Sequence, residues 1–192
     1  QPNHRPEKMN LPLSRVWFVL LFILSLTASG QSAQKGDRIQ IRQADRGYYR
    51  AGEERVNRLI GDVIFEHEGA LLYCDSAWLY PDRNSLEAFE NVHVIQDDTI
   101  HLYSDYLTYN GNTRLAEADG HVKLQDPSMT LFTDHLDFDR NNRTGIYLTG
   151  GKIINAENTL TSRIGIYYSA SRLFLFRDSV KLVNERYVMF SD

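Results

Sequence analysis

The sequence is poor in cysteine, glycine, proline and excess basic charge, and each shortage excludes a class of protein. Its single cysteine, Cys74, permits neither an intramolecular disulfide nor a cysteine-based zinc cluster. Twelve glycines and five prolines, beside 11 tyrosines and nine phenylalanines, argue against a disordered chain and favour strands. The chain has 21 Lys and Arg and 25 Asp and Glu, which gives a net charge of −4. Because it lacks an excess of basic residues, we expect no nucleic-acid partner.

Long apolar runs are also scarce, and the clearest lies near the start of the chain. Residues 16–26, "VWFVLLFILSL", follow Arg15 and precede the small residues "ASG" at 28–30. The run is too short for a bilayer, which needs about 20 helical residues, but it has the length of the apolar region of a secretory signal.

We therefore predict a signal peptide over residues 1–30, with the true start at Met9 and cleavage after Gly30. Residues 31–192 then form the working domain, outside the cytoplasm. An uncleaved membrane anchor is the alternative interpretation of the same run.

The rest of the chain repeats one phrase every 29 or 30 residues. "LLYCDSAWLY", "LYSDYLTYN", "LFTDHLDFD" and "LTSRIGIYY" are successive copies, and "MFSD" begins another. The same position in these copies is held by Asp75, Asp105, Asp134, Arg163 and Asp192. A fainter copy precedes them and ends at Asp45. So regular a period indicates a repeat protein, in which function resides in a stacked surface rather than in one catalytic cluster.

Each copy has two halves. The first places Leu or Met three positions before the Asp/Arg position, at Leu72, Leu102, Leu131, Leu160 and Met189. The second runs through a Gly/Asn-type turn to an apolar residue, as in "LIGDVIF", "FENVHVI" and "ADGHVKL". Apolar and polar residues tend to alternate in both halves, and "PDRN", "NGN" and "DRNNR" read as turns.

The pattern therefore predicts an all-β domain of short strands, about five residues each, with a period of about 29–30 residues. Corresponding residues should lie side by side, so that the Leu/Met positions form an apolar ladder. A sheet of this kind buries one face only by folding over on itself, as a jelly roll or a flattened tube with a hydrophobic lumen.

The alternation of a "GDV" or "GHV" turn with an "[LY]-x-[ST]-D-x-L-x-[YF]" strand resembles the OstA-like (organic solvent tolerance protein A, LptA-type) family. The resemblance runs from roughly Ile39 to Asp192. It implies an open β-jelly roll that is not an enzyme, has no cofactor, and carries or bridges lipopolysaccharide across the periplasm of a Gram-negative bacterium. It also implies partners: the acyl chains of lipid A, other lipopolysaccharide-transport proteins joined by edge-strand pairing, and further copies joined head to tail.

The resemblance and the alternation together place a set of side chains on the apolar inner face. The expected lipid-binding residues are Val63, Phe65, Leu72, Leu79, Val92, Val94, Leu102, Leu107, Tyr109, Val122, Leu124, Leu131, Leu136, Phe138 and Leu160. For any one of them, ordinary core packing is the competing interpretation.

The copies also depart from the family pattern. Glu90 stands where the other turns have Gly, the copy around Gly151 and Lys152 lacks the Val, and Arg163 replaces Asp. The sequence stops inside a repeat, at "MFSD", so either a terminal strand is missing or the natural protein continues.

Five histidines and the repeated aspartates raise the question of metal or catalysis. The histidines are His67, His93, His101, His121 and His135. Residues four apart on a strand are about 13 Å apart, too far to share one ion, so we expect no metal site.

The repeated aspartates could resemble the paired carboxylates of a glycosidase, which lie about 5–10 Å apart across a cleft. An Asp repeated at one position of each copy more simply marks a strand corner, so we expect no catalytic pair. Cys74 occupies the repeat position that holds Ser104 and Thr133 in other copies, and we expect it to be buried and to pack in the core.

The sequence leaves open the role of the basic N-terminal stretch and the choice between two functions. The basic stretch "QKGDRIQIRQADRGYYR" fits a solvated first strand, lipid phosphates at a groove entrance, or pairing with a neighbouring edge strand. The main alternative to a lipid carrier is a structural or adhesive β-solenoid of the cell envelope, with a closed interior and protein partners. An accessible apolar trough would distinguish the carrier from the solenoid.

Overall fold

The computed structural model describes residues 38–50, 52 and 54–192, which belong to a compact unit spanning Gly36–Asp192. The signal peptide predicted for residues 1–30, with its start at Met9, lies outside the described residues. The described residues form one antiparallel sheet of 15 strands and no helix, which confirms the all-β prediction. Consequently, this part of the chain contains no helix long and apolar enough to cross a membrane.

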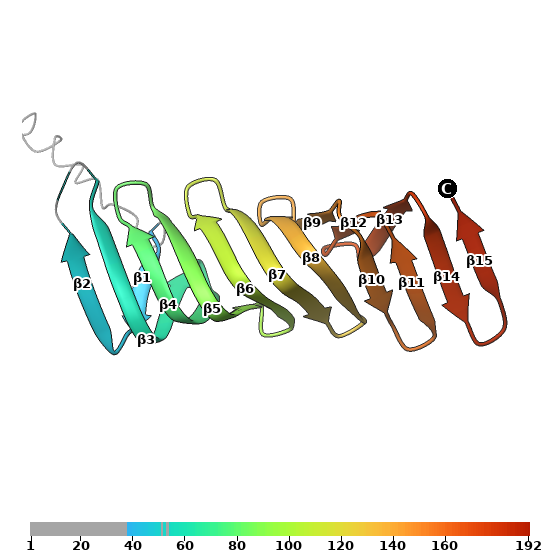
Figure 1. Ribbon diagram of the computed structural model, residues 1–192, viewed down its shortest axis with the longest axis horizontal. Coiled ribbons are helices and arrows are strands. Elements are labelled where there is room, and N and C mark those ends of the chain that lie inside the picture. The colour runs from blue at the N-terminus through green and yellow to red at the C-terminus, as the bar shows by residue number, and fades with distance from the viewer. Residues whose placement is uncertain (1–37, 51, 53) are drawn as a thin grey trace, which may run out of the picture. The chain divides into compact units, whose positions relative to one another are not determined.

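The strands follow one another along the sheet from β2 and β3 to β15, as Figure 1 shows. In chain order they are β1 (Gln40–Gln43), β2 (Arg46–Arg50), β3 (Val56–His67), β4 (Ala70–Tyr80), β5 (Ser85–Gln96), β6 (Ile100–Asn110), β7 (Leu115–Asp126), β8 (Met129–Asp139), β9 (Thr144–Tyr147), β10 (Gly151–Ile154), β11 (Asn158–Ser162), β12 (Ile164–Tyr168), β13 (Leu173–Arg177), β14 (Val180–Asn184) and β15 (Val188–Ser191).

The prediction of five-residue strands is wrong for the centre of the sheet, where β3 to β8 are 11 or 12 residues long. The "GDV", "ENV" and "GHV" segments do not end a strand. They bend it at a β-bulge, and pairing resumes in the same hairpin beyond the bend. Left-handed backbone makes the bend, as at Gly120 (φ 75°) and His121 (φ 46°).

The bends divide the sheet into two half-sheets that share one hydrophobic core. Half-sheet A comprises β1, β10, β11, β14, β15 and residues 63–67, 70–74, 92–96, 100–104, 122–126 and 129–133 of the long strands. Half-sheet B comprises β2, β9, β12, β13 and residues 56–60, 76–80, 85–89, 106–110, 115–119 and 135–139. Folding one half over the other produces an open jelly roll, one of the two forms that the repeat allowed and the form that the family resemblance implied.

The apolar ladder exists, with one correction to its spacing. Leu72, Leu102, Leu131, Leu160 and Met189 lie in one row across half-sheet A, but a residue of another strand separates each pair. From Phe65 onward the row is Phe65, Leu72, Val94, Leu102, Leu124, Leu131, Ile153, Leu160, Leu182 and Met189. Successive copies are therefore two strands apart, because each copy supplies two antiparallel strands to this half-sheet.

The core is tightly packed beside the bends. Ala77, Ala88 and Ala118 of half-sheet B are fully buried, as are Val63 and Leu131 of half-sheet A. Small and large side chains are mixed along this row of half-sheet B, where Leu107 lies between Ala88 and Ala118. Each fully buried aliphatic side chain of Val or Leu size contributes about 1.5–3 kcal/mol to folding.

Candidate functional site

A cavity of about 60 Å³ lies between the half-sheets, away from the bends. Side chains of both half-sheets line it, including Phe65, Leu72 and Leu102 from half-sheet A and Leu107 and Phe138 from half-sheet B. The wall is almost entirely apolar. The polar side chains that reach it are those of His67, Gln96, Tyr109 and Arg140.

The predicted inner-face residues all point toward the interior, but they fall into two groups. Eight of them line the cavity: Phe65, Leu72, Val94, Leu102, Leu107, Tyr109, Leu124 and Phe138. Six others lie buried in the surrounding core, namely Val63, Leu79, Val92, Val122, Leu131 and Leu136. The last, Leu160, is half-buried on β11. Lipid contact by any of the fifteen stays a prediction.

Several cavity residues were not predicted from the sequence. His67, at the end of β3, continues the inward alternation of Val63 and Phe65, but only apolar side chains were assigned to the inner face. Arg140 lies in the turn after β8, beyond the strand. The repeat gives no signal for Arg140, because Gly111 occupies the matching position of the preceding copy. Ile39 precedes β1 and Ile100 begins β6. At the start of a strand, the alternation of polar and apolar residues says least about which side chains point inward.

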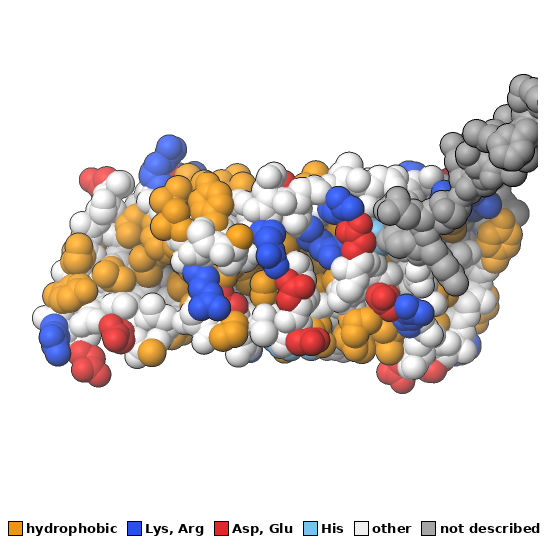
Figure 2. Space-filling view, turned by 180° about the vertical axis from the view of Figure 1, so that it is seen from behind, with side chains coloured by type: hydrophobic (Ala, Val, Ile, Leu, Met, Phe, Trp, Pro, Cys, Tyr) orange, Lys and Arg blue, Asp and Glu red, His pale blue; other side chains and the backbone are white. Residues whose placement is uncertain are grey.

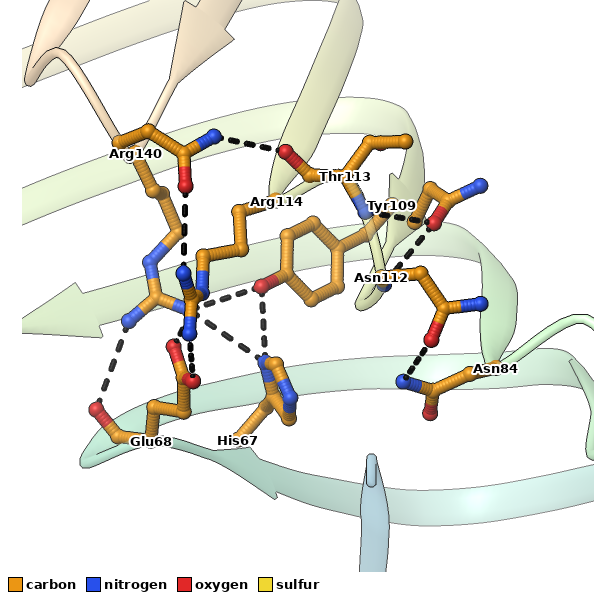
Figure 3. Close-up of polar contacts among 10 residues, drawn as sticks. His67, Glu68, Asn84, Tyr109, Asn112, Thr113, Arg114 and Arg140 are labelled. Carbon is orange, nitrogen blue, oxygen red and sulfur yellow. Dashed lines mark hydrogen bonds and ion pairs between the residues drawn. The ribbon is translucent and has the colours of Figure 1, made fainter. Parts of the chain in front are cut away.

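Arg140, Tyr109 and His67 form a hydrogen-bonded chain across the cavity wall (Figure 3). Arg140 Nη1 donates to the Tyr109 hydroxyl at 2.8 Å, and that hydroxyl lies 2.8 Å from His67 Nδ1. Arg140 Nη2 also donates to the Glu68 carbonyl at 3.4 Å. Burial raises the pKa of Tyr109, although the nearby Arg140 charge opposes that rise. The Tyr109 hydroxyl is therefore neutral at physiological pH, so it can accept from Arg140 and donate to His67.

Beside this chain, Glu68 of half-sheet A forms an ion pair with Arg114 of half-sheet B. Arg114 Nε lies 2.8 Å from Glu68 Oε2, and Arg114 Nη2 contacts the other carboxylate oxygen. The hydrogen bonds from Arg114 hold the pKa of Glu68 below its ordinary value. The pair bridges the turns of the two half-sheets on the side opposite the bends.

The same kind of contact recurs one repeat further along. Asp97 Oδ2 accepts from Arg143 Nη2 at 2.5 Å, and Asp97 and Arg143 each lie 29 positions after Glu68 and Arg114. The next acidic position is Asp126, which accepts a hydrogen bond from the Tyr167 hydroxyl. We call this row of contacts the seam: Glu68, Asp97 and Asp126 on half-sheet A, and Arg114, Arg143 and Tyr167 on half-sheet B.

Figure 2 shows how charge is arranged on one face of the molecule. Basic and acidic side chains gather in neighbouring groups along its middle, and hydrophobic side chains are exposed among them. Ion pairs at such exposed positions contribute little energy individually, about 0–1 kcal/mol each. Two of the three seam contacts are ion pairs with exposed members, whereas the Asp126–Tyr167 contact is buried.

The repeated aspartates mark the bends rather than a cleft. Asp105 Oδ2 lies 2.6 Å from His121 Nδ1, and Asp75 Oδ2 accepts from Asn91 Nδ2 at 2.7 Å. Both aspartates are exposed, as is Asp134. Hydrogen bonding to Asp105 raises the pKa of His121. The repeat thus uses Asp to bind the bulge of the next strand, at a corner of the sheet.

The histidines lie at separate places. His93 Nε2 is 3.1 Å from His101 Nδ1 on the outer face, whereas His135 Nδ1 is 2.6 Å from Asp119. Within residues 38–50, 52 and 54–192, no group of three or more His, Cys, Asp or Glu side chains could hold a metal ion.

Cys74 is buried, and burial raises the pKa of its thiol to about 12.

The basic N-terminal stretch forms β1 and β2 as far as it is described. β1 pairs with β3, and Arg42 Nε donates to Glu66 Oε2 at 2.6 Å across that pair. Arg46 and Arg50 are exposed on β2. Since β1 and β2 each pair only with β3 among the described strands, they form the first edges of the sheet.

Comparisons with known proteins identify a family and similar solved structures. The model of the family described as OstA-like protein matches residues 35–192. No curated protein matches significantly. Among solved structures, the chain is similar to LptH, the LptA-homologous periplasmic component of the conserved lipopolysaccharide transport device from Pseudomonas aeruginosa. The identity is 13%, the match covers 78% of this chain and 99% of that chain, and the TM-score is 0.36.

Proposed function

The chain belongs to the OstA-like family, and we propose that it is a non-enzymatic periplasmic protein that carries or bridges lipopolysaccharide between the inner and outer membranes. Acyl chains of lipid A would occupy the space between the half-sheets. Each methylene removed from water contributes about 0.8 kcal/mol, so a groove of this kind needs apolar area rather than a catalyst.

The observation that carries the proposal is the course of the apolar row through half-sheet A. Its middle, at Leu102, borders the cavity. Further along, Leu160 and Leu182 are half-buried, and Met189 on β15 is 56% exposed. The row therefore continues from a covered interior onto an accessible surface. Similar apolar positions in sequence along it would let an acyl chain move between sites of nearly equal energy.

Edge strands support the proposed partners. β15 pairs only with β14 and β13 only with β12 among the described strands, while β1 and β2 form the opposite edges. Such edges offer free N–H and C=O groups for strand addition. We propose pairing of these edges with other lipopolysaccharide-transport proteins, or head to tail with further copies of this chain.

One observation favours the alternative, a closed envelope solenoid with protein partners. Leu131 and Leu136 are fully buried, so the interior beside the bends is as closely packed as an ordinary core. The two functions therefore differ in whether the cavity and the half-buried end of the row admit an acyl chain.

Photo-crosslinking to lipopolysaccharide tests this difference on the full chain. A photoreactive residue replaces inward Leu102 or Leu182 in turn, with the outward neighbours Tyr103 and Lys181 as matched controls. The carrier predicts strong labelling at the two inward positions and little at the outward ones. Equal labelling on both faces would indicate non-specific adhesion, and labelling at none of the four would support the closed solenoid.

A further inference from the structure

Arg140 places a positive charge in the wall of a cavity that is mainly apolar. Its side chain lines the cavity, is half-buried and donates to the Tyr109 hydroxyl and to the Glu68 carbonyl. Its Nε is buried and has no hydrogen-bond partner. Arginine remains charged at any pH a protein experiences. The guanidinium therefore cannot avoid the free-energy cost of partial burial by losing its proton.

No charged side chain among the described residues forms an ion pair with Arg140. The nearby carboxylate is that of Glu68, and both of its oxygens are bound by Arg114. Counted over the described residues, Glu68, Arg114 and Arg140 hold one negative and two positive charges, so this cluster beside the cavity has a net positive charge.

The hydrogen bonds around Arg140 hold its guanidinium in place rather than compensate its charge. Tyr109 lies on β6 and His67 on β3, and their contact fixes the hydroxyl that accepts from Arg140 Nη1. Tyr109 and His67 are thus positioning residues. A partly desolvated charge that keeps only neutral partners is unfavourable until an anion approaches it.

We propose that this cavity is a binding site for a hydrocarbon chain that bears one anionic group, a carboxylate or a phosphate ester, and that Arg140 binds that group. The planar guanidinium suits either anion. The apolar wall, including Leu72, Leu102 and Phe138, takes the chain. The inference rests on the proposed lipid-carrying function and narrows it, because it makes Arg140 a determinant of which lipids enter the interior.

Equilibrium binding of three C16 probes to the full chain tests the proposal. Hexadecanoate carries a carboxylate, hexadecyl phosphate a phosphate ester, and hexadecanol no charge. We expect at least one anion to bind about tenfold or more tightly than hexadecanol, as a charged hydrogen bond requires. Preference for hexadecanoate would indicate free fatty acids as the source, and preference for hexadecyl phosphate would indicate phosphorylated lipids.

Variants assign the preference to Arg140. In Arg140→Met, which keeps an unbranched side chain without charge, the anion preference should fall to about one while hexadecanol binding changes less than threefold. Arg140→Lys should keep part of the preference. The exposed Arg186→Met is the matched control and should behave as the parent chain does.

Ionic strength gives a test that needs no variant. Anion binding should weaken as salt rises, whereas hexadecanol binding should not. This matters if Arg140→Met does not fold, which thermal melting would reveal.

Three results would overturn the proposal. Equal affinity of the parent chain for all three probes would remove the anion site but leave lipid carriage intact. Equal weakening of all three probes in a folded Arg140→Met variant would make Arg140 purely structural. Absence of binding by every probe, combined with no lipopolysaccharide labelling at Leu102, would refute the proposed function itself.

Discussion

The Tyr109 hydroxyl lies 2.8 Å from His67 Nδ1, although the two residues stand 42 positions apart and belong to different half-sheets. Their rings also meet edge to face, with centroids 5.6 Å apart. This contact ties the half-sheets together on the side opposite the bends, next to the cavity. The polar side chains that link the half-sheets here therefore also line the cavity.

Tyr109→Phe should lower the free energy of unfolding by about 1–3 kcal/mol, because the Arg140 guanidinium loses its hydroxyl acceptor while the ring remains. Urea denaturation measures the change. Tyr48→Phe is the matched control, since Tyr48 is 56% exposed and should shift stability by less than about 0.5 kcal/mol. Equal effects of the two substitutions would show that the Arg140–Tyr109 bond contributes nothing to folding.

The Asp126–Tyr167 contact should make stability depend on acid. Burial by itself would raise the pKa of Asp126, but hydrogen bonds from Ser128 and Tyr167 lower it below the ordinary value of 3.8. An Asp whose folded-state pKa is lowered contributes stability that is fully present above its unfolded-state pKa. That contribution is lost as pH falls below 3.8 through the folded-state value.

Asp126→Asn tests this dependence by comparison with the parent chain between pH 2 and 7. We expect the variant to be less stable by about 1–3 kcal/mol at pH 7, and the difference to shrink below pH 4. Asp98→Asn, at an exposed turn position, serves as the control. A difference that stays constant over the whole range would contradict the assigned pKa direction.

At the bend, His121 should titrate above its ordinary pKa of 6.5, because Asp105 stabilises its protonated form. NMR titration of the histidine ring signals measures this directly, and Asp105→Asn should lower the His121 pKa. His135 is the internal control, because its raised pKa depends chiefly on Asp119 and should not move.

The sign of the accompanying stability effect follows from the raised pKa. The His121–Asp105 interaction is fully present below pH 6.5 and is lost as pH rises through the folded-state pKa of His121. The side chain is fully exposed, so the effect on unfolding should be small. An unchanged His121 pKa in Asp105→Asn would refute the interaction in solution.

Gly120→Ala should destabilise the protein more than Gly69→Ala does. Both glycines have left-handed backbone, with φ of 75° and 79°. A methyl group on Gly120 would lie 2.5 Å from Asp105 Oδ2, whereas one on Gly69 would meet nothing within 4 Å. Gly69→Ala should therefore cost only the backbone strain, about 1–2 kcal/mol, and Gly120→Ala this strain plus the displacement of Asp105.

Thermal or urea unfolding of the two variants separates these effects. If Gly120→Ala were no more destabilising than Gly69→Ala, the close approach of Asp105 to the bulge would not be required for the bend. The comparison thus tests why the repeat pairs an aspartate with this turn.

The sequence by itself determined the local features of this protein. The 29- or 30-residue period, the alternation in segments such as "LYSDYLTYN" and the turn residues of "PDRN" and "NGN" predicted strands, turns and an inner row through Leu102 and Leu131. Such features depend on neighbours within a few positions, because side chains alternate along a strand and turn residues act on their own backbone.

Tertiary structure alone decided how the halves of each repeat are used. "GDV" and "GHV" read as the ends of strands, yet pairing across the hairpin continues beyond them, so they became bends inside strands of 11 or 12 residues. The cavity and the seam then followed from folding one half-sheet over the other. Arg140 meets His67 from 73 positions away. No repeat or alternation records that contact, because it depends on which turns face each other once the sheet has closed.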